Sequence, residues 1–307
     1  MTREEKYLGR IILKTKFYEA DKQSYEDLFT KIMQNQDSNF KQVKPQGRLG
    51  DGKCDGFNEK TGDYFQVYAP EDLNGNETVM LSKMNSSIVG LLEFWKERNF
   101  EVKKFNYVVK DDYKNVYPLI YTNAKKIAVK YKVECEIILC KDIEDIFMSL
   151  EEDKMIYVLG GMIPIADNIS NFEYDTMNDV VNHLKERKAR NILEKIPSNP
   201  NFDNKIIFNS LSEVISEFLN IGQRQNFAIN DFFQLNSKFI KEDLREIFST
   251  LYEEGKEFIP KSETKNDEIF QYIVEKSSPN EKQSTYDAIF VLIAYYFEYC
   301  DIFETPN

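Results

Sequence analysis

The residues with the clearest capacity for chemistry lie in one short stretch, residues 47–70, which reads GRLGDGKCDGFNEKTGDYFQVYAP. Asp55 lies in the first of two predicted strands. Gln66 and Tyr68 lie two apart on the second, so their side chains leave the same face. If the strands pair across the EKTGD turn, Asp55 and Gln66 approach each other at one sheet edge. Such a pair can hold a divalent metal against a phosphate, because Mg²⁺ needs only one or two carboxylates besides other oxygen ligands.

The glycines of this stretch admit two interpretations. Gly50, Gly52 and Gly56 would let the backbone approach a bulky ligand closely. The pairs GDG and DG are equally common in hairpin turns, and QVYAP is also compatible with a plain buried strand. The stretch therefore predicts either a ligand-binding edge or ordinary turn structure. A small-molecule-binding α/β sensor is a third possibility that rests only on these glycine turns.

This stretch resembles the nuclease core of the restriction-endonuclease-like (PD-(D/E)xK) superfamily, closest to its Mrr-type branch. In that branch a strand of the form GDGG-(I/V)-DG precedes a strand bearing QxK, and the matching segments here read GDGKCDG and QVY. The resemblance covers residues 20–140. It implies that Asp55 is the metal-binding aspartate, that Gln66 is a second ligand of Mg²⁺, and that Glu26 in the preceding helix assists catalysis.

The chain departs from this pattern where Tyr68 takes the place of the catalytic lysine. That lysine stabilises negative charge on the phosphate or orients the attacking water, whereas a tyrosine hydroxyl supplies a hydrogen bond but no charge. Lys53 and Lys83 are candidates to replace it, and with Arg48 they are the candidate nucleic-acid-binding residues. Two hypotheses follow: a divergent Mg²⁺-dependent endodeoxyribonuclease, or an inactive nuclease-fold subunit that binds DNA or scaffolds a complex.

The elements that position these residues are read from hydrophobic periodicity. Residues 3–35 predict two helices, and residues 39–69 predict short strands with a hairpin at EKTGD. Alternating helices and strands follow, which indicates an α/β domain with a mixed sheet whose strands are buried on both faces. The segments expected there are a helix from residue 85, strands 105–109 and 135–140, helices 119–132 and 142–150, and a strand or helix end at 155–161.

The sequence changes character near residue 165. Residues 165–175 are typical of a linker, and the remainder is helical by period, with a last helix over 285–300 that is apolar nearly all round and should be buried. The loops expected between these helices are 198–205 and 259–267. The prediction is therefore a restriction-endonuclease-like α/β domain over 1–165 and an all-α domain over 166–307.

The second half carries a resemblance of its own. NKIIFNSLSEVISEFL (204–219) and YYFEYCDIFETP (295–306) are similar to C-terminal helical regions of proteins from bacterial ABC three-component systems. In those systems an effector acts with a small component and an ABC/SMC-like ATPase against phage and foreign DNA. The resemblance implies that residues 166–307 bind partner subunits, including that ATPase. Whether the chain also forms a homo-oligomer stays open.

Charge restricts where DNA can bind. The net charge is -12, and it is concentrated in residues 166–307, which hold 15 Lys+Arg against 25 Asp+Glu, whereas residues 1–165 hold 25 against 27. The acidic half would repel nucleic acid, so DNA contact is expected in the first half. Residues 96–132, with ten Lys and Arg and four acidic residues, are the densest basic stretch. A solvated surface is the alternative interpretation.

Composition narrows the class of protein further. Hydrophobic residues make up 42% of the 307 residues, enough to exclude wholesale disorder. No apolar run approaches ~18 residues, so no membrane span is expected. The N-terminus lacks a secretion signal and the four cysteines lack a CxxC pair, which favours a cytoplasmic protein with reduced thiols. No GxxxxGK[ST] motif is present, so any ATPase must be a partner.

Overall fold

The computed structural model describes residues 1–45, 52–70, 77–161, 163–164, 173–187, 201–236, 239–299 and 301–306. The chain forms two compact units. The sheet unit comprises Lys16–Val158, and the helical unit comprises Met1–Thr15 together with Leu159–Asn307. The first fifteen residues, which the sequence grouped with the sheet, therefore pack with the C-terminal helices.

The sheet unit is built on five strands in the order β1-β2-β3-β4-β5. They are β1 (Phe40–Gln42), β2 (Gly56–Asn58), β3 (Asp63–Tyr68), β4 (Lys104–Val109) and β5 (Glu134–Ile138). The first three strands pair antiparallel, and β3, β4 and β5 pair parallel, so the predicted mixed sheet is confirmed. EKTGD forms the predicted hairpin turn, in which Gly62 has a φ of 78°, a conformation that glycine adopts without strain.

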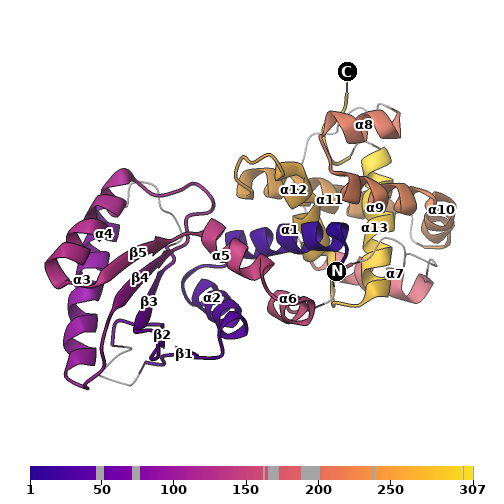
Figure 1. Cartoon of the computed structure of the whole chain (residues 1–307). Helices are drawn as coiled ribbons and strands as arrows, with labels where there is room; N and C mark the ends of the chain where they lie inside the picture. Colours follow the sequence, from indigo (N-terminus) through magenta and orange to yellow (C-terminus); the bar gives the residue numbers. More distant parts are fainter. Residues whose placement is uncertain are drawn as a thin grey trace. The chain divides into compact units, whose positions relative to one another are not determined.

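Six helices accompany these strands along the first part of the chain. They are α1 (Arg3–Glu19), α2 (Lys22–Gln36), α3 (Glu77–Lys96), α4 (Pro118–Tyr131), α5 (Cys140–Met148) and α6 (Glu152–Leu159). Figure 1 shows α3 and α4 on one face of the sheet and α2 on the other. The segment 155–161, for which the sequence allowed a strand or a helix end, lies in α6 up to Leu159.

Both faces of the sheet carry aromatic side chains, because successive residues of β3 point to opposite sides. Tyr64 packs with Trp95 of α3 at a centroid distance of 5.1 Å, whereas Phe65 packs with Phe29 of α2 at 5.8 Å. Strand β4 is buried from Phe105 onward, as predicted.

The expectation of full burial is wrong for β5, in which Glu134 and Glu136 are exposed. This strand has a neighbour on one side only, and Glu136 forms an ion pair with Lys104 at the surface. The predicted strand 135–140 also ends early, at Ile138. The N–H of Leu139 donates to the Asp142 carboxylate at 2.8 Å, which starts α5 there.

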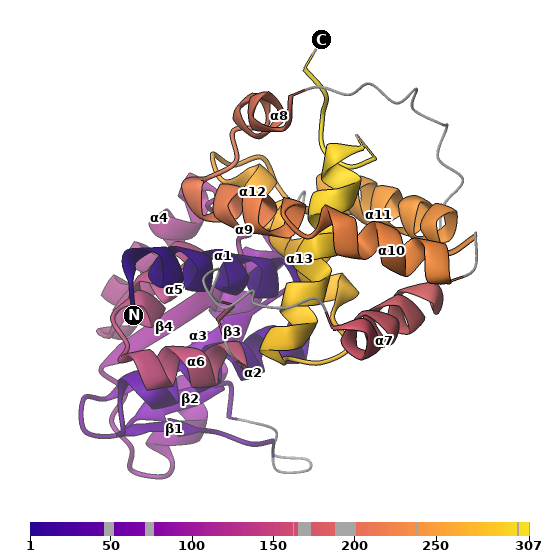
Figure 2. The same ribbon diagram turned by 90° about the vertical axis from the view of Figure 1, so that its right-hand side faces the viewer.

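The helical unit contains seven further helices among its described residues. They are α7 (Tyr174–Lys185), α8 (Phe202–Phe208), α9 (Glu213–Gln223), α10 (Asn226–Leu235), α11 (Phe239–Phe258), α12 (Lys265–Ser277) and α13 (Gln283–Glu298). Helix α13 runs through the middle of this unit (Figure 2), and its residues from Ala288 to Phe297 are buried, as predicted for the apolar last helix. Gly222 of α9 allows the close packing, because a Cβ there would lie 2.6 Å from the Phe290 carbonyl oxygen.

Two predicted connections differ from expectation or cannot be compared. Helix α8 begins at Phe202, inside the segment 198–205 that was expected to be a loop. The side chain of Asn201 caps that helix by accepting a hydrogen bond from the Asn204 N–H at 3.1 Å. Most of the predicted linker 165–175 lies outside the described residues. No helix in the described part of the chain is long and apolar enough to cross a membrane.

Residues 1–15 join the helical unit through two buried acidic side chains of α12. The hydroxyl of Tyr7 donates to Asp267 at 2.5 Å. Lys14 Nζ lies 3.0 Å from Glu268 Oε1, and Glu268 is fully buried. Because an unpaired carboxylate is costly inside a protein, this part of α1 is an integral element of the unit.

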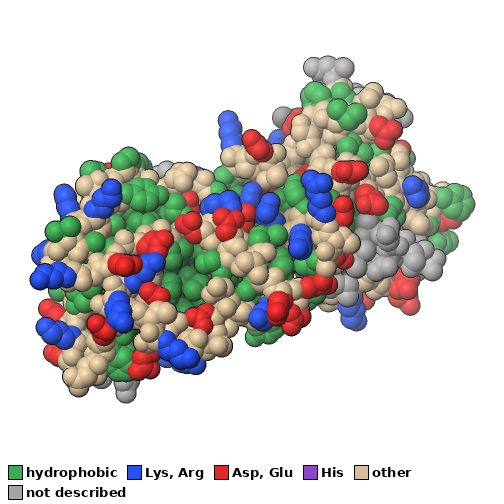
Figure 3. Space-filling view, viewed as in Figure 1, with side chains coloured by type: hydrophobic (Ala, Val, Ile, Leu, Met, Phe, Trp, Pro, Cys, Tyr) green, Lys and Arg blue, Asp and Glu red, His purple; other side chains and the backbone are tan. Residues whose placement is uncertain are grey.

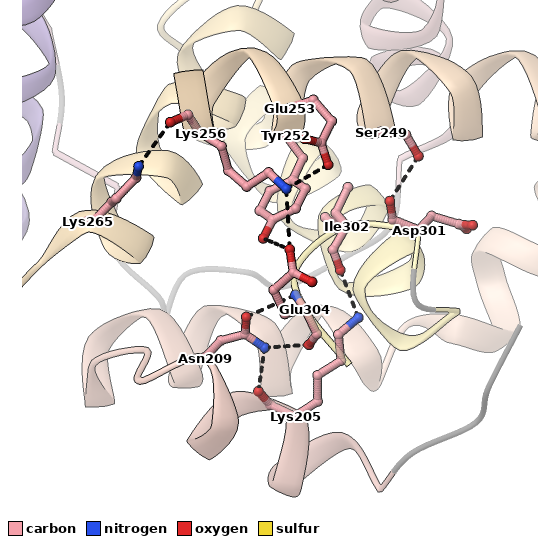
Figure 4. Close-up of polar contacts among 10 residues, drawn as sticks. All are labelled: Lys205, Asn209, Ser249, Tyr252, Glu253, Lys256, Lys265, Asp301, Ile302 and Glu304. Atoms are coloured by element: carbon pink, nitrogen blue, oxygen red, sulfur yellow. Dashed lines mark hydrogen bonds and ion pairs between the residues drawn. The ribbon is translucent and has the colours of Figure 1, made fainter. Parts of the chain in front are cut away.

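The C-terminal segment is held against α8 by a buried lysine (Figure 4). Lys205 is 1% exposed, and its Nζ donates to the carbonyl oxygens of Phe297 at 2.6 Å and Ile302 at 2.7 Å. The side-chain amide of Asn209 exchanges two hydrogen bonds with the backbone of Glu304, at 2.8 and 3.0 Å. Residues 301–303 are thereby buried in the helical unit.

Candidate functional site

Asp55 and Gln66 meet where the β2–β3 hairpin reaches the carboxyl end of β3. Asp55 directly precedes β2, and the pairing of Gly56 with Phe65 sets Asp55 opposite Gln66. Gln66 Nε2 donates to Asp55 Oδ2 at 2.7 Å. The predicted approach of these two side chains is confirmed.

The Asp55 carboxylate also has a structural task. Its Oδ2 accepts a second hydrogen bond, at 2.6 Å, from the backbone N–H of Val67, and the side chain is almost fully buried. In this arrangement Gln66 directs its amide nitrogen, not its amide oxygen, at Asp55. Two oxygen ligands would face one metal only after the Gln66 amide turned over, a rotation that changes its hydrogen bonds but not its shape.

Tyr68 lies two residues beyond Gln66 and stacks on Tyr107 of β4. The ring centroids are 5.9 Å apart and the ring planes differ by 17°. Burial raises the pKa of Tyr68, so its hydroxyl is protonated at neutral pH. It can donate a hydrogen bond to a phosphate oxygen but supplies no positive charge.

Lys83 brings a cation close to Tyr68. Its Nζ lies 5.1 Å from the centroid of the Tyr68 ring, although the two residues come from α3 and β3. The Lys83 side chain is exposed, so its ammonium group can reach a ligand without crossing the core. Of the two replacements that the sequence suggested, Lys83 is the one for which the structure shows a contact with Tyr68.

The other predicted residues are placed less directly. Lys53 is exposed in the loop before Asp55, and its side chain packs on Gly90, where a Cβ would lie 2.9 Å from Lys53 Cγ. Glu26 lies half-buried in α2, whose first residue donates its N–H to Ala69, just after β3, at 3.0 Å. The start of α2 is therefore at the same sheet edge as Gln66. Arg48 lies outside the described residues.

Tyr107 is a site residue that the sequence did not reveal. It is the partner of Gln66 in the parallel pairing of β3 and β4, and it is 1% exposed. Its hydroxyl is buried and lacks a hydrogen-bond partner among the described residues. Burial raises the pKa of Tyr107, so its hydroxyl stays protonated at neutral pH and can donate a hydrogen bond. The segment FNYVV predicted a strand, but only the inter-strand register sets Tyr107 beside Gln66.

A second cluster of polar contacts lies at the same sheet edge, just after the last residue of β4. The backbone N–H of Lys110 donates to the Tyr68 carbonyl at 3.0 Å. The Asp111 carboxylate accepts hydrogen bonds from the N–H groups of Asn115 and Cys140, each at 2.9 Å. Burial raises the pKa of the Cys140 thiol to about 12, so it is no nucleophile. This cluster fastens the loop after β4 to the start of α5.

The donor groups at Asp55 suit one kind of metal site. Among the described residues, no three His, Cys, Asp and Glu side chains come together as a metal site, which rules against a ligand set of the zinc type there. One carboxylate with an amide oxygen and waters is a set that Mg²⁺ accepts. Asp55 with a rotated Gln66 fits that description.

The C-terminal part of the chain is similar to a known family. Residues 175–304 match the model of C-terminal domain 10 of the ABC-three component (ABC-3C) systems. No curated protein and no solved structure matches the chain. The match begins in α7 and reaches the segment after α13, so the resemblance noted for the helical region is confirmed there. A C-terminal domain of this kind indicates that the chain is a component of a defence system.

Proposed function

We propose that the chain is an effector of an ABC-three component defence system that acts on DNA with a divergent, metal-dependent endonuclease site in the sheet unit. The contact between Asp55 and Gln66 at 2.7 Å carries the proposal. The order of elements supports it, because helix α2, the strand after Asp55 and the strand bearing Gln66 follow one another as the PD-(D/E)xK resemblance implies.

Each residue has a separate role in this proposal. Asp55 and the amide oxygen of Gln66 hold Mg²⁺, which when bound activates a water and neutralises phosphate charge. Lys83 supplies the positive charge that Tyr68 lacks, and the Tyr68 hydroxyl orients a phosphate oxygen. Glu26 assists from α2. The helical unit connects the effector to a partner ATPase.

An inactive subunit is the second candidate, and one observation favours it. Oδ2 of Asp55 already accepts two hydrogen bonds from the hairpin, which is the behaviour of a structural carboxylate. A nuclease fold that has lost cleavage would keep this pair to stabilise the hairpin and would bind DNA or scaffold the complex.

Cleavage by the full chain separates the candidates. Plasmid and single-stranded DNA are incubated with the protein in Mg²⁺ or Mn²⁺, beside Asp55→Asn and the matched control Asp63→Asn, which changes an aspartate at the other end of the same hairpin. Metal-dependent cutting that is lost only in Asp55→Asn supports the nuclease. Absence of cutting, both alone and with the partner ATPase, together with salt-sensitive DNA binding, supports the inactive subunit.

A further inference from the structure

The solvent-facing side of α4 is basic and has no acidic residue. Residues 113–133 contain five lysines and no Asp or Glu. Ile120, Ala124 and Ile127 turn toward the core. The opposite side exposes two rows at helical spacing, Tyr121, Lys125 and Val129 in one row and Thr122, Lys126 and Lys130 in the other, and the exposed Lys132 follows as the left-handed C-cap.

The lysines of this face have no acidic partner among the described residues, whereas two lysines nearby do. Neighbouring Lys103 and Lys104 form ion pairs with Glu101 and Glu136. No ion pair within the described ranges includes a lysine of α4 or Lys132, and Lys130 contacts only the ring of Tyr131, at 4.9 Å. Like charges one turn apart disfavour a helix, so these lysines lower the stability of α4. We therefore expect them to serve binding and not folding.

Exposed aromatic and apolar side chains accompany the charge. Tyr121 is 43% exposed and Val129 is 82% exposed, and Tyr117 just before the helix is 45% exposed. In Figure 3, Lys and Arg side chains stand along the edge of the sheet unit where α3 and α4 lie, with hydrophobic surface between them.

The surface of α4 continues into the helix that carries Lys83. Asn123 of α4 donates to Asn85 of α3 at 3.3 Å and contacts Met84 Sδ at 3.4 Å. Lys83 is next to these residues and lies over Tyr68. Lys83, which lies over the residue two positions after Gln66, and the lysines of α4 therefore belong to two helices that contact each other within one unit.

We propose that this face of α4 binds the phosphate backbone of a nucleic acid. From Lys125 to Lys130 the helix advances about 8 Å, and Lys132 follows as its C-cap, a length that spans about three phosphates at the ~3.4 Å rise of one strand. A regular row of cations without intervening acids matches a regularly repeating anion better than it matches the mixed charges of a protein surface. The exposed tyrosines add rings on which unpaired bases stack.

The inference adds to the proposed function the surface that would bind the DNA substrate. It rests on the proposed function only in that DNA, and not RNA, is taken as the nucleic acid. Its test measures binding, not cleavage. Binding is measured in EDTA, where no metal-dependent cutting can occur, so failure of the nuclease proposal and failure of the α4 surface are distinguishable.

The experiment uses the full chain and labelled 30-nucleotide single- and double-stranded DNA in fluorescence anisotropy between 50 and 200 mM NaCl. Lysines 125, 126, 130 and 132 are changed together to Gln, which keeps the helix propensity high. The control changes Lys41, Lys44, Lys60 and Lys96 to Gln, which removes the same charge from exposed positions elsewhere in the sheet unit. Unchanged melting temperatures show that both variants are folded.

We expect the α4 variant to bind DNA at least about 10-fold more weakly near 100 mM NaCl. The magnitude of the slope of log K against log[salt] should fall by about three, because each phosphate contact contributes about 0.9 to it. The control should change the affinity less than about 3-fold. Equal losses in both variants would mean that only net charge matters and would overturn the inference. A second outcome would also overturn the inference: the α4 variant keeps its affinity for DNA but no longer binds polyglutamate or phosphatidylglycerol vesicles. The face would then bind another anion.

Discussion

Lys83 lies above the aromatic ring of Tyr68, with its Nζ 5.1 Å from the ring centroid, so a cation from α3 stands beside the strand residue that the proposed nuclease site would need to be a lysine. The two residues are 15 positions apart and come from different elements. In the proposed nuclease site, Lys83 would supply the positive charge that Tyr68 of β3 cannot supply.

Replacement of Lys83 therefore tests the proposed active site. Lys83→Gln should lower the cleavage rate by about 10²-fold or more, because a group that stabilises developing charge is worth that much. Lys83→Arg should retain part of the rate. Lys96→Gln, an exposed lysine at the other end of α3, is the control and should cleave normally. Normal cleavage by Lys83→Gln would remove this residue from the mechanism.

Gln66→Glu tests whether the Asp55–Gln66 pair can hold a metal. Two carboxylates in contact raise the pKa of one of them. A pKa that is higher in the folded than in the unfolded state makes the variant lose stability, relative to the unchanged protein, as pH rises from about 5 to 8. Mg²⁺ at millimolar concentration should restore the melting temperature at pH 8, as followed by differential scanning fluorimetry.

The double variant Asp55→Asn/Gln66→Glu is the control for that experiment, since it keeps one carboxylate and one amide. Its melting temperature should not fall with pH in this range. A Gln66→Glu protein that responds neither to pH nor to Mg²⁺ would contradict a metal site at this pair.

Asp287 of α13 predicts a pH-dependent stability of the helical unit. Burial raises the pKa of Asp287 to about 6. The hydrogen bond from Gln283 lowers this pKa, and the negative charge of Glu173 raises it. Because this carboxyl binds its proton more tightly when folded, its contribution to stability is full below about pH 4 and is lost as pH rises through 6.

Asp287→Asn should remove that loss and raise the free energy of unfolding at pH 7 by about 1 kcal/mol. Urea unfolding at pH 4.5 and pH 7, compared between the variant and the unchanged protein, measures the difference. The same difference at both pH values would show that Asp287 titrates normally. Asp175→Asn on α7 provides a surface control.

Lys205 predicts how firmly the C-terminal segment is attached. Lys205→Met keeps the length of the side chain but leaves the carbonyl oxygens of Phe297 and Ile302 without their donor. The expected loss is about 2–3 kcal/mol in the free energy of unfolding, as for other buried groups left unpaired. Thermal and urea unfolding measure it, and Lys261→Met at an exposed position is the control. Equal stability of the two variants would show that the segment is held by its apolar residues alone.

The sequence by itself determined the features that depend on short stretches of chain. The contact of Asp55 with Gln66 was predictable because a tight turn joins their strands and thereby sets the register. Most helices of the second half were predictable because an apolar face recurs every three to four residues, whereas α8 begins inside a segment predicted to be a loop. The burial of α13 followed from its apolar residues on all sides.

Only the tertiary structure decided which distant residues become neighbours. Tyr107 meets Gln66 through the parallel register of β3 and β4, two strands that are joined through α3 and not by a tight turn. Lys83 reaches Tyr68 for the same reason. Residues 1–15 pack with the helical unit because Asp267 and Glu268 need partners there. Such pairings depend on how whole elements share a core, and no local pattern of residue types records them.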